Sequence, residues 1–119
     1  MTKNSHYQTG LKGEEIAAKF LQKKTMVLLH QRYHSPYGEI DLIMQDGNTM
    51  VFVEVKTRTN GNHEQALGSI SKKKKEKIIK SANYFIGMLQ EDISARFDVV
   101  SISKDGIMHI KNAFEGFQW

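Results

Sequence analysis

The chain has 119 residues, enough for one domain with a modest hydrophobic core, so we expect residues 1–119 to form a single domain. It contains no cysteine, which excludes disulfides and thiolate zinc sites. No stretch approaches the roughly 18 apolar residues of a membrane span, and no secretory signal is visible, so a cytoplasmic protein is expected. The net charge of +4 is compatible with a polyanionic partner.

Hydrophobic periodicity and turn residues predict an alternation of helices and strands. In chain order we expect a helix over residues 9–24, strands over 26–33, 39–45 and 49–58, a helix over 71–89, and strands over 97–102 and 107–111. The sequence Asp46-Gly47-Asn48 is a strong hairpin signal between the second and third strands. The order α-β-β-β-α-β-β predicts an α/β fold, a mixed sheet flanked by helices.

The two strands joined by this hairpin carry acidic residues between apolar ones. Side chains alternate between the faces of a strand, so the apolar positions of both strands should share one core face. These positions are Ile40, Leu42, Met44, Val51, Val53 and Val55. The opposite face then carries Glu39 and Asp41 from one strand, and Glu54 and Lys56 from the other. Desolvating a carboxylate is costly unless a positive charge pairs with it, so this group of charges needs a common explanation.

The length of the hairpin turn decides whether these acids can meet. A two-residue turn at Gly47-Asn48 places Asp41 directly opposite Glu54 and Glu39 opposite Lys56. A two-residue turn at Asp46-Gly47 places Glu54 one diagonal step from Asp41. A three-residue turn without a bulge would put the two acids on opposite faces of the sheet. A shared acidic site therefore predicts a turn of even length.

Two carboxylates about 5 Å apart repel each other, so either one binds a proton or a cation lies between them. Oxygen ligands favour a hard ion, and the pattern predicts Mg²⁺ or Mn²⁺ held by Asp41 and Glu54. Lys56 would orient or help to deprotonate a water, and Glu14 from the first helix would bind a second ion or a metal-bound water. The alternative is a solvated sheet face on which Glu39 pairs with Lys56, and Glu54 with Lys56 or Arg58.

At these residues the sequence resembles the PD-(D/E)XK nuclease superfamily, whose signature of Asp, a gap and Asp/Glu-x-Lys is matched by Asp41 and Glu54-Val55-Lys56. More closely, the chain resembles the YraN-like family of small bacterial proteins, which are related to archaeal Holliday-junction resolvases. The matching segments are 10–14 with Ala17, 38–43, 51–56 with Arg58, 96–100, and 113–114. Thr25 stands where this family usually has Gly, and Gln31 where it usually has Asn.

The resemblance implies a restriction-endonuclease-like fold with an α-β-β-β-α-β core. It implies Glu14, Asp41, Glu54 and Lys56 as the active-site set, and DNA, including branched DNA, as the substrate class. Because resolvase relatives act as dimers, a homodimer is a further expectation.

The remaining charged residues have two interpretations each. Lys72, Lys73 and Lys74 would bind DNA phosphates together with Arg58, or form a solvated helix face. Glu39 would tune Lys56 or pair with it.

Three further predictions concern the rest of the chain. Asp98 is expected to form a structural ion pair with Arg96. Gln65 is a candidate phosphate contact, and the aromatic tail 114–119 is expected to pack on the core or on a partner copy.

Three function classes follow from these features. The first is a metal-dependent endonuclease that hydrolyses phosphodiester bonds in DNA. The second is a nucleic-acid-binding module that keeps the nuclease fold without cutting, and the third is a protein-interaction module that uses the aromatic tail. Retention of the two acids and the lysine favours the first class, because a binding module does not need all three.

Overall fold

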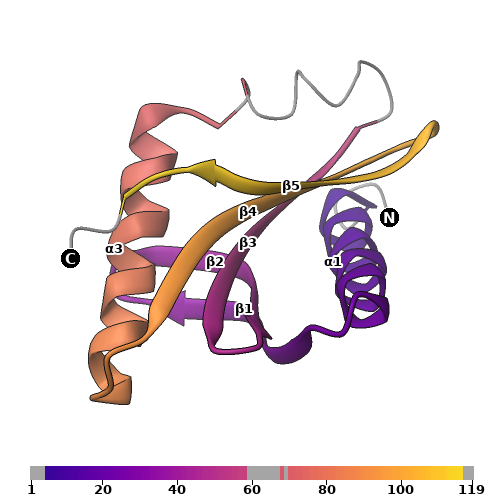
Figure 1. Cartoon of the computed structure of the whole chain (residues 1–119). Coiled ribbons are helices and arrows are strands. Elements are labelled where there is room, and N and C mark those ends of the chain that lie inside the picture. The colour runs from indigo at the N-terminus through magenta and orange to yellow at the C-terminus, as the bar shows by residue number, and fades with distance from the viewer. Residues whose placement is uncertain (1–4, 59–67, 69, 117–119) are drawn as a thin grey trace.

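A five-stranded sheet lies between two helices in the computed structural model, which describes residues 5–58, 68 and 70–116 (Figure 1). The elements are α1 (Ser5–Lys23), β1 (Val27–Ser35), β2 (Gly38–Asp46), β3 (Thr49–Thr57), α3 (Lys72–Leu89), β4 (Ser94–Ser103) and β5 (Gly106–Phe114). The α/β fold predicted from the sequence is therefore confirmed, with its element order. Helix α1 begins at Ser5, four residues earlier than expected, and β4 and β5 are longer than expected.

The strand order in the sheet follows the order in the chain, β1 to β5. All neighbours are antiparallel except β3 and β4, which are parallel because α3 carries the chain back across the sheet. The β2–β3 hairpin pairs Asp46 with Thr49, so the turn contains Gly47 and Asn48. Gly47 has a φ of 61°, which suits glycine in such a turn. The even turn length that a shared acidic site requires is thus present.

Each helix covers one face of the sheet with its own apolar cluster. The cluster under α1 contains Ala17, Ala18, Leu21, Met26, Leu42, Met44, Val51, Val53 and Val100. The cluster under α3 contains Ile40, Ile43, Met50, Phe52, Ile78, Ala82, Phe85 and Phe97. The prediction that Ile40 shares a face with Leu42 and Met44 is therefore wrong. The pairing of β2 with β3 ends at Leu42 and Val53, and beyond that point Ile40 packs on the α3 side.

Helix α1 ends in a left-handed residue, which fixes the direction in which the chain enters β1. The backbone N–H of Met26 donates to the carbonyl of Leu21 at 3.2 Å, and that of Thr25 donates to Gln22 at 3.0 Å. This is the Schellman arrangement, in which the residue after the helix adopts a positive φ. Thr25 has a φ of 70° at that place, which explains why the similar family favours Gly there.

Several predictions fall on residues outside the described part of the chain. These are the polar loop 59–64, the candidate phosphate contact Gln65 and the end of the aromatic tail, 117–119. Within the described residues, no helix is both long and apolar enough to cross a membrane.

Candidate active site

Asp41 lies where the β2–β3 ladder ends. The paired register of β2 and β3 ends beside it, at Leu42 and Val53, so the ladder does not itself pair Asp41 with Glu54. The Oδ2 atom of Asp41 accepts a hydrogen bond from the backbone N–H of Val55 at 2.8 Å. A side chain thus satisfies a backbone donor of β3, which holds the carboxylate beside the strand that carries Glu54 and Lys56.

Glu54 is buried on the α3 face of β3 and is paired with a lysine from the helix. The Nζ atom of Lys74 lies 2.6 Å from Oε1 of Glu54. Burial, and after it the nearby charge of Asp41, raise the pKa of Glu54 to about 7, because Lys74 only partly offsets these effects. The pKa of Lys74 is raised because the hydrogen bond to Glu54 and its charge outweigh the burial of the ammonium. The pair therefore leaves part of the negative charge at this site uncompensated.

Glu14 approaches the same charges from α1. Its Oε1 atom accepts a hydrogen bond from Nε of Arg32 on β1 at 3.1 Å. Burial raises the pKa of Glu14 to about 7, followed by the charge of Asp41, against the lowering effect of Arg32. Since Asp41 raises the pKa of both glutamates, the three carboxylates form one electrostatic group.

Lys56 completes the set on the face of β3 that carries Glu54. Burial lowers the pKa of its ammonium, and the charge of Lys74 lowers it further, against the opposing effects of Glu54 and Asp41. Within the predicted active-site set, Asp41 thus interacts electrostatically with each of the other three residues, Glu14, Glu54 and Lys56. A half-buried lysine with a lowered pKa is a common feature of functional sites.

A pocket of about 450 Å³ opens between the acids and the first turns of α3. It is lined by Gly38, Glu39, Asp41, Glu54, Ser71, Lys73, Lys74, Lys77 and Ile78. The acids come from β2 and β3 and the lysines from the first turns of α3, so the pocket is lined by charges of both signs.

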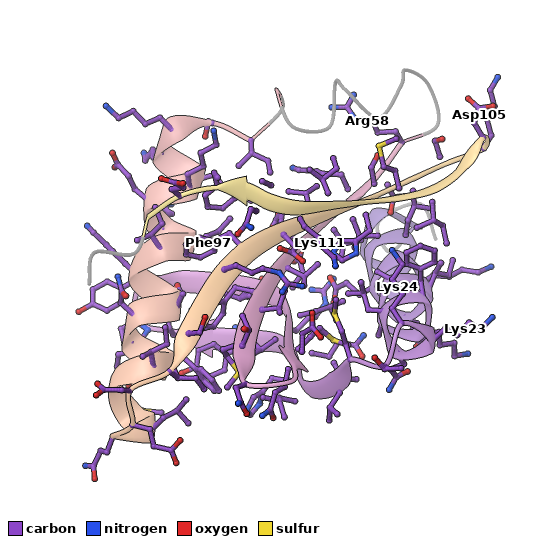
Figure 2. The ribbon with its side chains drawn as sticks, viewed as in Figure 1. Lys23, Lys24, Arg58, Phe97, Asp105 and Lys111 are labelled. Carbon is purple, nitrogen blue, oxygen red and sulfur yellow. The ribbon has the colours of Figure 1, made fainter. Side chains whose placement is uncertain are left out.

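The predicted DNA-binding residues divide between this pocket and the surface. Lys73 and Lys74 line it, whereas Lys72 is exposed and lies outside the lining. Arg58 also lies outside the lining. Its backbone N–H donates to the carbonyl of Ile102 at 2.8 Å, and in Figure 2 it lies near the end of β3, well separated from α3.

Glu39 lines the pocket but pairs with a histidine. Its Oε1 atom lies 3.0 Å from Nδ1 of His34, and both side chains are largely exposed. The structure pairs Glu39 with His34 and Glu54 with Lys74, where the alternative had Lys56 for Glu39 and Lys56 or Arg58 for Glu54. Glu39 contributes to the site through its charge, which raises the pKa of Glu14.

Two carboxylates are the donor set that a divalent ion would find here. In the part of the chain that the structure describes, no three His, Asp or Glu side chains are grouped as ligands for one ion. Mg²⁺ commonly takes only one or two protein carboxylates and completes its shell with water and substrate phosphate. Asp41 and Glu54 fit this mode of binding, since both line the pocket.

Sequence reasoning did not find Arg32, and it missed the specific role of Lys74. Lys74 lies four residues before the buried Ile78, on the edge of the apolar stripe of α3, and this spacing could have separated it from Lys72 and Lys73. Arg32 has a φ of 52°, and no residue pattern announces this backbone conformation.

Comparison with known proteins gives the family. The profile described as "Uncharacterised protein family UPF0102" matches residues 13–102. The chain belongs to the UPF0102 family. A UPF0102 protein from Herminiimonas arsenicoxydans is 39% identical over 106 residues, which cover 89% of this chain and 86% of the relative. One from Thermodesulfovibrio yellowstonii is 38% identical over 107 residues, covering 90% and 96%, and one from Nitrosomonas eutropha is 42% identical over 107 residues, covering 89% and 92%.

The matched region of the UPF0102 chain includes all four members of the active-site set, Glu14, Asp41, Glu54 and Lys56. It also includes the lysines of the pocket wall, because α3 lies within residues 13–102. The pocket is thus built entirely from the part of the chain that defines the family.

Proposed function

We propose that this UPF0102 protein is a metal-dependent endonuclease that hydrolyses phosphodiester bonds in DNA, with branched DNA among its candidate substrates. The observation that carries the proposal is the pocket in which Asp41 and Glu54 face Lys73, Lys74 and Lys77. The element order and the positions of the acids agree with a restriction-endonuclease-like core, and the proposal adopts that relationship.

Each residue has a role that its surroundings support. Asp41 and Glu54 would hold Mg²⁺ or Mn²⁺, an ion that supplies polarisation of the phosphate and a more acidic bound water. Lys56 would donate a hydrogen bond to water or to the developing charge on the phosphate. Glu14, with a pKa of about 7, is suited to hold a water on the α1 side and to accept a proton near neutral pH.

The lysine wall would bind the DNA backbone. Lys73 and Lys77 reach into the pocket from the first turns of α3, where the backbone N–H groups also favour an anion. Contacts of this kind give affinity without sequence preference and make binding weaken as salt concentration rises. A second copy of the chain would present a second pocket, which is the proposed role of a homodimer on branched DNA.

The test is a cleavage assay on duplex, single-stranded and four-way-junction DNA with Mg²⁺ or Mn²⁺. Wild type should cut at least one substrate, and Asp41→Asn and Lys56→Met should each reduce the rate roughly 100-fold or more. Asp41→Asn keeps an oxygen that can accept from the Val55 N–H, so the loss would not arise from an unpaired backbone donor. Equal cleavage by wild type and both variants would show contamination and would remove the proposal.

A second candidate is a DNA-binding module that keeps the fold but does not cut. The ion pair between Glu54 and Lys74 favours it, because Lys74 already supplies part of the positive charge that a metal would bring. Salt-dependent DNA binding that is insensitive to Mg²⁺, with no cleavage of any substrate, would support this alternative.

A further inference from the structure

An exposed stripe on α3 leads away from the pocket. Lys73, Lys77, Lys80 and Tyr84 recur at spacings of four, three and four residues, so they lie along one side of the helix. All four side chains are exposed. The stripe begins with two residues of the pocket lining and ends with an aromatic ring.

Tyr84 is paired with a second exposed tyrosine from the β1–β2 turn. The ring centroids of Tyr37 and Tyr84 are 6.2 Å apart with an interplanar angle of 70°. Tyr37 is 51% exposed and Tyr84 is 39% exposed. The apolar core below them is filled by Tyr33 and Phe85, whose rings lie 5.2 Å apart, so the outer pair is not needed to close the core. We call Tyr37 and Tyr84 the tyrosine pair.

The turn that carries Tyr37 is fixed to α3 next to the pocket. The hydroxyl of Ser35 donates to the hydroxyl of Ser81 at 2.7 Å, and the backbone N–H of Tyr37 donates to Ser35 Oγ at 3.0 Å. Gly38 lines the pocket, and a β-carbon at this position would lie 3.6 Å from Cβ of Lys77. The tyrosine pair and the pocket are therefore held in fixed positions relative to each other.

The distance along the helix matches a short stretch of nucleic acid. Seven residues separate Lys77 from Tyr84, which corresponds to about 10 Å of helix rise. This is the span of roughly three stacked nucleotides at 3.4 Å each. Exposed aromatic rings beside a lysine-lined track are the usual means by which proteins bind unpaired bases, because every base has a face that can stack. In a duplex the bases stack on one another and cannot reach such a ring.

We propose that the tyrosine pair is a stacking site for an unpaired base of single-stranded DNA whose phosphates lie along Lys73, Lys77 and Lys80. The inference rests on the proposed function for its choice of DNA, and it adds a substrate class: DNA with unpaired nucleotides a few positions from the phosphate in the pocket. Neither the family match nor the active-site set assigns a role to these tyrosines.

The test measures binding of the full chain by fluorescence anisotropy in EDTA, so that cleavage does not interfere. Three probes of equal length are compared: a single strand of thymidines, the same strand with abasic sites, and a duplex. Tyr37→Ala and Tyr84→Ala should each weaken binding of the thymidine strand at least about fivefold. The same variants should change binding of the abasic strand and of the duplex less than twofold.

Matched variants separate stacking from a general effect. Tyr37→Phe and Tyr84→Phe keep the rings and should bind like wild type, and Met108→Ala, which trims an exposed side chain on β5, should also have no effect. Equal losses on the base-bearing and abasic strands, or no loss in either alanine variant, would overturn the inference. Since the assay needs no metal, its failure would leave the cleavage result standing, and base-dependent binding without cleavage would retain this inference while removing the proposed nuclease.

Discussion

Two clusters of buried charge lie in the part of the chain that the structure describes, and they differ in how completely their acids are paired. In the first, Asp98 on β4 is fully buried and its carboxylate accepts hydrogen bonds from three groups. These are Nε of Arg96 at 3.1 and 3.2 Å, Nε2 of His109 at 2.6 Å and the backbone N–H of Asn112 at 3.1 Å. Burial alone would raise the pKa of Asp98, but the bonds from His109 and Arg96 lower it below its ordinary value.

The paired cluster extends into a chain of contacts on the α1 side of the sheet. Arg96 also donates to Asp46 in the β2–β3 hairpin at 3.1 Å, and Nζ of Lys24 lies 3.3 Å from Nδ1 of His109. Figure 2 labels Lys24 beside α1. Because an ammonium can only donate, Nδ1 of His109 accepts, and the proton on Nε2 is donated to Asp98. The cluster therefore ties the hairpin, β4, β5 and the end of α1 together.

The second cluster is the candidate site, where burial raises the pKa values of Glu14 and Glu54 to about 7 and Asp41 adds to the effect. Both clusters are buried and both contain basic partners, so burial alone does not distinguish structure from function. The difference is the sign of the pKa shift. The Asp98 carboxylate is fully hydrogen-bonded, whereas the basic partners of Glu14 and Glu54 only partly offset the effect of burial.

The largest expected effect concerns the paired cluster. Asp98→Ala leaves His109, Arg96 and the Asn112 N–H without their acceptor, and should lower the free energy of unfolding by about 3–5 kcal/mol. Urea denaturation measures this loss. Asp105→Ala, at an exposed turn between β4 and β5, is the control and should change little. A loss below about 1 kcal/mol for Asp98→Ala would show that the cluster is not the structural element described here.

In the candidate site, replacing a buried acid is expected to raise the free energy of unfolding instead of lowering it. A carboxyl whose folded pKa is raised favours folding below its unfolded pKa, and this contribution is lost as pH rises through the folded value near 7. Glu54→Gln should therefore raise the stability of the metal-free protein at pH 8 by about 2 kcal/mol, with the gain shrinking toward pH 5. Denaturation at both pH values tests this, beside the exposed control Glu15→Gln. A loss of stability in Glu54→Gln at pH 8 would mean that Glu54 is paired as completely as Asp98.

Divalent cations should stabilise the protein through the candidate site and not through the paired cluster around Asp98. At pH 8 and roughly tenfold above its dissociation constant, Mg²⁺ should stabilise the wild type by about 1–2 kcal/mol. Asp41→Asn should abolish this stabilisation, and His109→Gln should retain it. Thermal denaturation with and without Mg²⁺ measures the effect. Stabilisation that survives in Asp41→Asn would indicate an ion bound elsewhere.

The smallest expected effect belongs to Lys74, whose ammonium competes with a cation for Glu54. Lys74→Met should tighten Mg²⁺ binding roughly threefold to tenfold, since pairs with a partly exposed lysine contribute about 1 kcal/mol or less. Calorimetric titration measures the affinity. It is done at pH 8.5, where Glu54 stays ionised, so that protonation of Glu54 does not replace the lost ion pair. Lys72→Met, outside the pocket, is the control. Weaker binding in Lys74→Met would mean that this lysine supports the metal instead of competing with it.

Local signals in the sequence were sufficient for the hairpin. Asp46-Gly47-Asn48 specifies a tight turn of even length, and the pocket that Asp41 and Glu54 both line agrees with a shared site. The ion pair between Arg96 and Asp98 was also predicted and is confirmed. These features follow from neighbours in the chain or from a single turn length.

Contacts that depend on irregular backbone could not be predicted. The face of Ile40 changes where β2 leaves β3, and the register of β1 shifts between Leu28 and His30. A shift of one residue moves every later side chain to the other face of the sheet. Beyond such a point, the face of a residue no longer follows from counting along the strand. The partner of Glu54 depends on how α3 lies on the sheet, and a run of lysines does not reveal which member reaches the acid.

The bond from the Val55 amide to Asp41 gives the candidate site an internal reporter. Exchange of that amide hydrogen with solvent depends on how firmly the Asp41 carboxylate is held. Cation binding that immobilises the carboxylate should slow the exchange at Val55, whereas a partner that pulls the carboxylate away should speed it. Occupancy of the pocket can thus be followed at one backbone position, in the intact chain and without turnover.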